Sequence, residues 1–128
     1  MSPSDVDAVR LQLNDVATFW NCALVRLQSV ARDNPERSCA IYGAGVYGSY
    51  LATRLEKILN LKCFVDRNPH VWGVSEFGVP ILPPGELPMD VDLVFSGVNP
   101  LKARAIMSDI PEWRGRSVEI VFLDEDRQ

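Results

Sequence analysis

The chain has 128 residues, of which 47% are hydrophobic and 23% are charged, and its 17 acidic and 13 basic side chains give a formal net charge of −4. This length and composition predict one soluble globular domain. The acidic balance argues against nucleic acid as a partner, and no apolar run approaches the ~18 residues that span a bilayer. The three cysteines are too widely spaced for a disulfide framework or a metal site: Cys22, Cys39 and Cys63. We expect small buried thiols in a reducing compartment, and hence a cytoplasmic protein.

The segment from Ser4 to about Arg32 contains no glycine or proline and is predicted to form a long helix. A helix of this length reaches ~42 Å, so it must bend, break or project beyond its own domain. Apolar residues recur along it at alternating spacings of four and three, which predicts a continuous apolar seam on one face: Val9, Leu13, Val16, Trp20, Ala23, Leu27 and Val30. Two interpretations stay open. The seam packs on the rest of the same chain, or part of it meets its symmetry mate in a homodimer.

A polar, proline-containing linker at residues 33–37 ends this helix, so we divide the chain into a helix with its linker, residues 1–37, and one domain, residues 38–128. Short apolar segments predict strands at residues 39–42, 62–66, 77–82, 92–97 and 117–123. Helices are predicted at residues 46–59 and from Pro100, capped by Asn99, to about residue 110. This alternation predicts an α/β fold with a small, doubly wound parallel sheet of about five strands.

A glycine-rich motif, G-x-G-x-x-G, follows the first predicted strand and opens the first helix of this domain. In such a loop the first glycine permits a tight turn, the second lets a phosphate approach the backbone, and the third lets the helix pack close to the strand. The free N–H groups at the start of the helix then form an anion site. The sequence therefore predicts a phosphate-binding loop made of Gly43, Ala44, Gly45, Val46, Tyr47 and Gly48.

Asp66 ends the second predicted strand, 18 residues beyond Gly48. At this position a carboxylate accepts hydrogen bonds from ribose hydroxyls in dinucleotide-binding folds. Strand, loop, helix, strand and acid in this order predict a Rossmann-like domain with a nucleotide site. The alternative interpretation is that the glycines serve only the turn, and that Asp66 only caps the turn at Asn68 and Pro69.

Arg67 bears on the choice of nucleotide, because an arginine here could stack on a base or bind a 2′-phosphate. Since Asp66 would repel that phosphate, we expect NAD or another nucleotide with free ribose hydroxyls rather than NADP. Residues 96–99 should form the second lip of the site, at the end of a neighbouring strand. There we expect Asn99 to cap the next helix and Gly97 to keep the floor open for a ribose or nicotinamide.

The sequence from residue 38 to about 110 resembles the Rossmann-like domain of nucleotide-sugar-modifying proteins. The resemblance rests on Ile-Tyr-Gly-Ala-Gly at residues 41–45, Val-Asp-Arg-Asn-Pro at 65–69, Gly73, and Gly-Val-Pro-Ile-Leu-Pro at 78–83. Similar domains occur in polysaccharide-biosynthesis sugar dehydratases, at the N-terminus of sugar O-acyltransferases and at the C-terminus of sugar C-methyltransferases. The resemblance implies NAD or a UDP-sugar as ligand, contacted by the glycine loop and Asp66. The resemblance does not extend to the second catalytic domain of those proteins, and we expect this chain to lack it.

No tyrosine lies four residues before a lysine, the pair that short-chain dehydrogenases use for proton transfer, and we assign no catalytic or metal-binding residue. The sequence thus favours a nucleotide-binding module for NAD or a nucleotide-sugar, dimeric through its N-terminal helix. Its catalytic partner groups would lie on another chain or in a larger sugar-modifying enzyme. The alternatives are a ligand-free Rossmann-like interaction or structural domain and, more weakly, a small NAD-dependent oxidoreductase or epimerase.

Overall fold

The computed structural model describes residues 3–124, and the side chains of residues 17–124. The helices are α1 (Pro3–Asp33), α2 (Val46–Leu55) and α3 (Pro100–Met107), with single 3-10 turns at Pro69–Val71, Pro84–Glu86 and Pro111–Trp113. The strands are β1 (Ser38–Tyr42), β2 (Asn60–Val65), β3 (Ser75–Glu76), β4 (Val79–Leu82), β5 (Val91–Ser96) and β6 (Glu119–Val121). No helix in this part of the chain has the length and apolar composition to cross a membrane.

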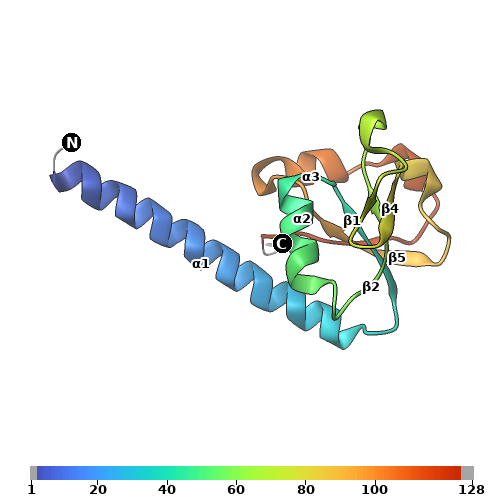
Figure 1. The fold of residues 1–128 in the computed structure, drawn as a ribbon, viewed down its shortest axis with the longest axis horizontal. Coiled ribbons are helices and arrows are strands. Elements are labelled where there is room, and N and C mark those ends of the chain that lie inside the picture. Colours follow the sequence, from blue (N-terminus) through green and yellow to red (C-terminus); the bar gives the residue numbers. More distant parts are fainter. Residues whose placement is uncertain (1–2, 125–128) are drawn as a thin grey trace.

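The strands form one sheet in the order β3-β4-β2-β1-β5-β6. All neighbouring pairs are parallel except β3 with β4. From β1 the chain builds outward through β2 and β4 on one side, and then returns to add β5 and β6 on the other side (Figure 1). The direction of winding therefore reverses between β1 and β5, at the place where ligands bind in open α/β sheets.

The predicted α/β fold is confirmed, with a sixth strand added by a hairpin. Phe77 and Gly78 connect β3 to β4 with φ angles of 52° and 77°. Two consecutive residues with positive φ are typical of the tight turn that matches the twist of a two-residue hairpin. The prediction that Phe77 begins an extended segment is wrong for this reason.

Both predicted helices of the domain end early. Helix α2 stops at Leu55 rather than residue 59, and the N–H of Ile58 donates to the Leu55 carbonyl at 3.0 Å in a tighter turn. Helix α3 stops at Met107 rather than about residue 110. Ile110 is extended because it precedes Pro111, whose ring disfavours a helical conformation in the residue before it.

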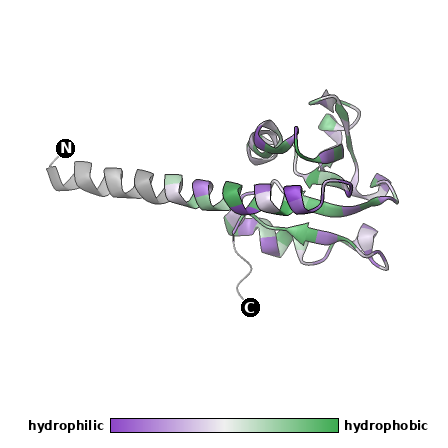
Figure 2. Ribbon diagram, turned by 90° about the horizontal axis from the view of Figure 1, so that it is seen from below, coloured by the Kyte–Doolittle hydropathy of each residue, from purple (hydrophilic) through white to green (hydrophobic). Residues whose placement is uncertain are grey.

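Apolar side chains alternate between the two faces of the sheet, so both faces are buried. On one face, Ile41 and Phe95 pack with α2 and with the C-terminal half of α1. On the other, Tyr42 and Val94 pack with Met107 of α3 and with Trp113. The hydrophobic stretches of ribbon accordingly lie along the strands, between the two covering layers (Figure 2).

Helix α1 belongs to this core only in part. Ala23 and Leu27 of the predicted seam are buried, and Trp20 and Val30 are half-buried. The predicted seam positions Val9, Leu13 and Val16 lie outside the described side chains. The expectation of three buried thiols is wrong for Cys22, which is exposed because it lies to the side of the seam, whereas Cys39 and Cys63 are buried in strands.

Candidate functional site

The glycine loop connects β1 to α2 and is held by glycine-to-glycine packing. Gly43 has a φ of +102°, a conformation that a side chain would strain. A Cβ atom on Gly48 would come within 1.8 Å of the Gly43 carbonyl oxygen, so only glycine fits there. The loop therefore has the close strand-to-helix packing predicted from the sequence.

Gly45 has different surroundings, since a Cβ atom there would meet nothing within 4 Å. It is exposed and precedes α2 without a side-chain cap. Among the described residues, no acceptor binds the N–H groups of Gly45, Val46 or Tyr47. Free N–H donors at the positive end of a helix dipole are the groups that bind anions in proteins, so the anion site expected from the sequence stays a prediction for this loop.

Asp66 lies directly beside this loop, just beyond the end of β2. Its Oδ2 accepts a hydrogen bond from the Ala44 N–H at 2.9 Å, and its Oδ1 accepts one from the Asn68 N–H at 2.8 Å. The indole N–H of Trp72 donates to the Asp66 carbonyl at 2.6 Å and further holds the turn. The carboxylate thus orders both the loop and the turn. It has about four lone-pair positions and keeps about two for a ligand.

Arg67 is held by an ion pair with Glu112, which precedes Trp113. Its two terminal nitrogens lie 2.9 Å and 3.0 Å from the two carboxylate oxygens of Glu112. This paired geometry raises the pKa of Arg67 and lowers the pKa of Glu112. The guanidinium is therefore already engaged, and a 2′-phosphate would have to compete with Glu112 for it.

The second lip lies at the end of β5, next to the loop. Asn99 caps α3 as predicted, since its side-chain oxygen accepts from the Leu101 N–H at 3.0 Å. The interpretation of Gly97 needs correction. A Cβ atom on Gly97 would come within 2.7 Å of the Gly48 Cα, so this glycine lets β5 approach the loop and does not leave an open floor.

Two buried hydroxyl groups beside the end of β5 were not predicted from the sequence. Tyr42 and Ser96 are paired in register at the carboxyl ends of β1 and β5, and both are buried. Neither hydroxyl has a partner at hydrogen-bonding geometry among the described residues, although the Arg67 guanidinium lies close enough to the Tyr42 hydroxyl to affect its ionisation. Burial raises the pKa of Tyr42, although the nearby Arg67 opposes this. The signal in the sequence was a polar hydroxyl at the last position of each of these two strands, Tyr42 and Ser96, since buried hydroxyls usually have partners.

Two buried thiols and one exposed imidazole are further groups that can carry chemistry in proteins. Burial raises the pKa of the Cys39 and Cys63 thiols to about 11, so both stay protonated near neutral pH. His70 is exposed in the turn after Asp66. No cluster of histidine, cysteine or acidic residues suited to a metal ion occurs within the described part of the chain.

No model of a known protein family matches the sequence, and no curated protein matches it. Solved structures do match. UDP-D-quinovosamine 4-dehydrogenase from Vibrio fischeri aligns with a TM-score of 0.53 and 20% identity, over 67% of this chain and 76% of that one.

Two structures of RSP, a Rex-family repressor, also match. One aligns with a TM-score of 0.51 and 18% identity over 77% of this chain and 58% of the repressor chain. The other, a complex with β-NADH, aligns with a TM-score of 0.55 and 20% identity over 89% and 59%. This chain thus spans about three fifths of the repressor's length. The similarities show that it has a Rossmann-type fold.

Proposed function

We propose that the chain is a nucleotide-binding module whose ligand carries a diphosphate and a ribose with free hydroxyls, which describes both NAD and nucleotide-sugars. The observation that carries this proposal is the 2.9 Å hydrogen bond between Asp66 and the Ala44 N–H. It brings a carboxylate that can accept ribose hydroxyls beside a loop whose N–H donors are free for phosphate. The reversal of strand order between β1 and β5 is the place where ligands bind in open α/β folds, and this supports the proposal.

In this proposal the diphosphate lies against the backbone at Gly45 and Val46, where no side chain stands in the way. The ribose diol hydrogen-bonds to the remaining lone pairs of Asp66. The repressor complex with β-NADH supports NAD as the ligand, and the UDP-D-quinovosamine 4-dehydrogenase supports a nucleotide-sugar. The reacting groups would come from another chain or domain, within a sugar-modifying enzyme or assembly.

Asp66 and Arg67 together favour NAD over NADP. The carboxylate would repel a 2′-phosphate, and the arginine that could compensate is already bound by Glu112 at both terminal nitrogens. We therefore expect NADP to bind at least tenfold more weakly than NAD, in titrations carried out at the same ionic strength.

The test is thermal unfolding of the chain with NAD, NADP and UDP-sugars. A ligand at 100 times its Kd should stabilise the fold by ~2.7 kcal/mol. Gly45→Val should abolish that shift by blocking the approach of phosphate to the backbone. Gly85→Val is the matched control, because Gly85 is also exposed and does not need a positive φ. An equal loss of the shift in both variants would move the site elsewhere.

A ligand-free Rossmann-like interaction domain is the second candidate. The specific observation in its favour is that both oxygens of Asp66 already accept backbone N–H groups, so the residue has a structural role without any ligand. If no nucleotide shifts the unfolding midpoint of the intact chain, this second function replaces the first.

A further inference from the structure

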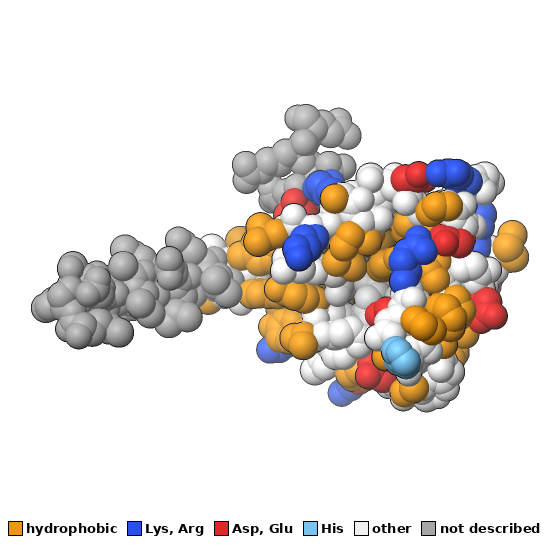
Figure 3. All heavy atoms as spheres, turned by 90° about the horizontal axis from the view of Figure 1, so that it is seen from above, with side chains coloured by type: hydrophobic (Ala, Val, Ile, Leu, Met, Phe, Trp, Pro, Cys, Tyr) orange, Lys and Arg blue, Asp and Glu red, His pale blue; other side chains and the backbone are white. Residues whose placement is uncertain are grey.

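An aromatic groove lies between α1 and the start of α2. Three partly buried rings form it: Trp20 stacks on Tyr47 at a centroid distance of 5.8 Å and meets Tyr50 edge to face at 4.9 Å. The groove has a volume of about 520 Å³, and hydrophobic side chains gather there, beside the place where α1 leaves the domain (Figure 3). The other lining residues are Ala17, Asn21 and Val46. Its size and its mainly aromatic lining are typical of a small-molecule site.

The groove begins where the glycine loop ends. Val46, the first residue of α2, lines the groove with a side chain that is 83% exposed. Its backbone N–H is one of the loop donors without an acceptor among the described residues. Tyr50 lies four residues further along α2, which at about 1.5 Å per residue is only about 6 Å. A phosphate bound at Gly45 and Val46 would therefore lie at the mouth of the groove.

Asp66 lies on the other side of this loop. It follows β2, which neighbours β1 on one side, whereas β5 and β6 lie on the other side. Helix α1 lies toward β6, since Arg26 donates to the carbonyls of Leu123 and Asp124, just after that strand, at 2.8 Å and 3.0 Å. A nucleotide with its first ribose at Asp66 and its diphosphate at the loop would thus direct its other half toward the groove.

We propose that the groove binds the ring that the nucleotide carries on its outer phosphate, which is the nicotinamide half of NAD or the sugar of a nucleotide-sugar. This inference rests on the proposed function and adds the residues that recognise the second half of the ligand. Both rings have an apolar face and polar substituents. The apolar face packs on the aromatic side chains at Trp20 and Tyr47, and the exposed amide of Asn21 can hydrogen-bond to the substituents.

Paired ligands test this assignment, because ADP and UDP lack the ring that NAD and UDP-glucose carry. In calorimetric titrations we expect Trp20→Leu to weaken the binding of NAD or of UDP-glucose roughly fivefold, and to leave the binding of ADP and UDP unchanged. The pair that responds identifies the ring. The matched control is Phe77→Leu, which removes a ring that is 41% exposed in the turn between β3 and β4 and does not line the groove. This variant should change none of the four affinities.

A second measurement needs no substitution. In the NMR spectrum of the wild-type chain, the indole N–H signal of Trp20 should shift when the ring-bearing nucleotide is added, and should stay in place when the matching diphosphate is added. The indole N–H of Trp113 is an internal control, because it donates to the Pro84 carbonyl at 2.8 Å in the core. Its signal should respond to neither ligand.

The outcomes separate this inference from the proposed function. Equal weakening of all four ligands by Trp20→Leu, or an unchanged Trp20 signal with NAD and UDP-glucose bound, overturns the assignment of the groove and leaves the proposed function standing. A dimer that Trp20→Leu dissociates in sedimentation, with unchanged ligand affinities, assigns the groove to a second copy of the chain and also overturns it. If none of the four ligands binds, the proposed function fails and this inference fails with it.

Discussion

Gly45 and Gly48, three residues apart in one loop, have opposite surroundings. At Gly48 an added Cβ atom would stand 1.8 Å from a backbone oxygen, whereas at Gly45 it would meet nothing within 4 Å. We therefore expect Gly48→Ala to lower the free energy of unfolding by about 3 kcal/mol, because backbone must move to admit the methyl group. Gly45→Ala should cost much less, about 0.5 kcal/mol, because its methyl group meets no atom and alanine is only a poorer N-cap for α2. Urea unfolding of both variants measures this, and equal effects would show that the loop is not packed as described.

The three thiols should differ sharply in reactivity. Cys22 is exposed, whereas Cys39 and Cys63 are fully buried with pKa values raised to about 11 by loss of hydration. We expect one thiol per chain to react rapidly with a disulfide reagent at pH 8, and all three after unfolding in guanidinium. Cys22→Ser should remove the fast phase. A fast phase of two or three thiols in the native protein would contradict the burial of β1 and β2.

The two buried thiols, Cys39 and Cys63, make stability depend on pH in the alkaline range. In the unfolded chain they titrate near their ordinary pKa of 9.0, and in the folded chain near 11. Between these values the unfolded state loses protons that the folded state keeps, so stability is unaffected below about pH 9 and falls as pH rises toward 11. We expect the double variant Cys39→Ala, Cys63→Ala to show a shallower fall in unfolding free energy over this interval, whatever its stability at pH 7.

At the scale of elements, local signals were sufficient for some parts of the fold and not for others. The glycine loop, and the Asn99 cap with Pro100 after it, depend on residues adjacent in sequence and could be predicted. Contacts between distant segments could not. The packing of Gly97 on Gly48 and the pairing of Arg67 with Glu112 depend on how strands and turns come together in space. The nucleotide site itself stays a prediction, because its geometry is compatible with a purely structural role of Asp66.

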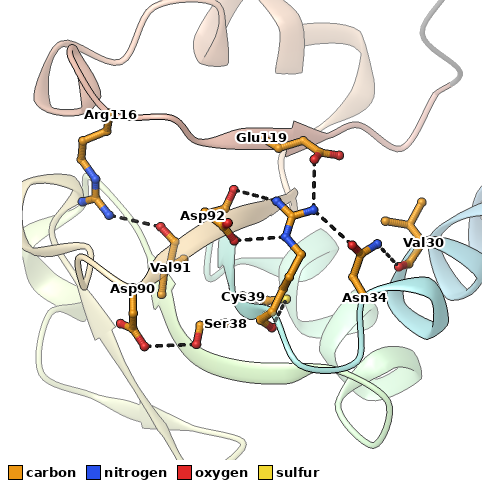
Figure 4. A network of polar contacts seen from close by, with 10 residues as sticks. Val30, Asn34, Ser38, Cys39, Asp90, Val91, Asp92, Arg116 and Glu119 are labelled. Carbon is orange, nitrogen blue, oxygen red and sulfur yellow. Dashed lines mark hydrogen bonds and ion pairs between the residues drawn. The ribbon is translucent and has the colours of Figure 1, made fainter.

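Arg37 connects three elements at the end of the sheet opposite the candidate site (Figure 4). Its guanidinium lies 3.2 Å from Asp92 of β5 and 3.1 Å from Glu119 of β6, and it donates to the Asn34 side chain at 3.2 Å. Since the side chain is only partly exposed and several partners share it, we expect Arg37→Met to cost about 1 kcal/mol of unfolding free energy. The loss should shrink at high salt.

A single surface pair provides the control for that prediction. Arg114 makes an ion pair with Asp109 in which both side chains are well exposed, so Arg114→Met should leave the unfolding midpoint unchanged. If both variants destabilise equally, the Arg37 network contributes no more than an ordinary surface ion pair, and its connection of three elements has no energetic consequence.

At the scale of the whole molecule, the C-terminal half of α1 is bonded to the segment that follows β6. The Arg26 guanidinium donates to the carbonyls of Phe122, Leu123 and Asp124, the last two at 2.8 Å and 3.0 Å. The division between residues 1–37 and 38–128 remains a prediction from the linker's composition. Because the C-terminal half of α1 covers one face of the sheet, we expect residues 38–128 alone to expose part of that face.

Leu27 tests whether the helix is part of the domain's core. It is fully buried against the sheet, and truncation to alanine removes apolar atoms and leaves a cavity, which typically costs about 3 kcal/mol. Val25→Ala, two residues away on the exposed side, should leave the unfolding free energy unchanged within about 0.5 kcal/mol. A helix that only tethered a second copy would give small effects at both positions. A large loss at Leu27 alone would instead mean that the C-terminal half of α1 is an integral part of the domain's folded core, to which the N-terminal half of the helix is rigidly attached.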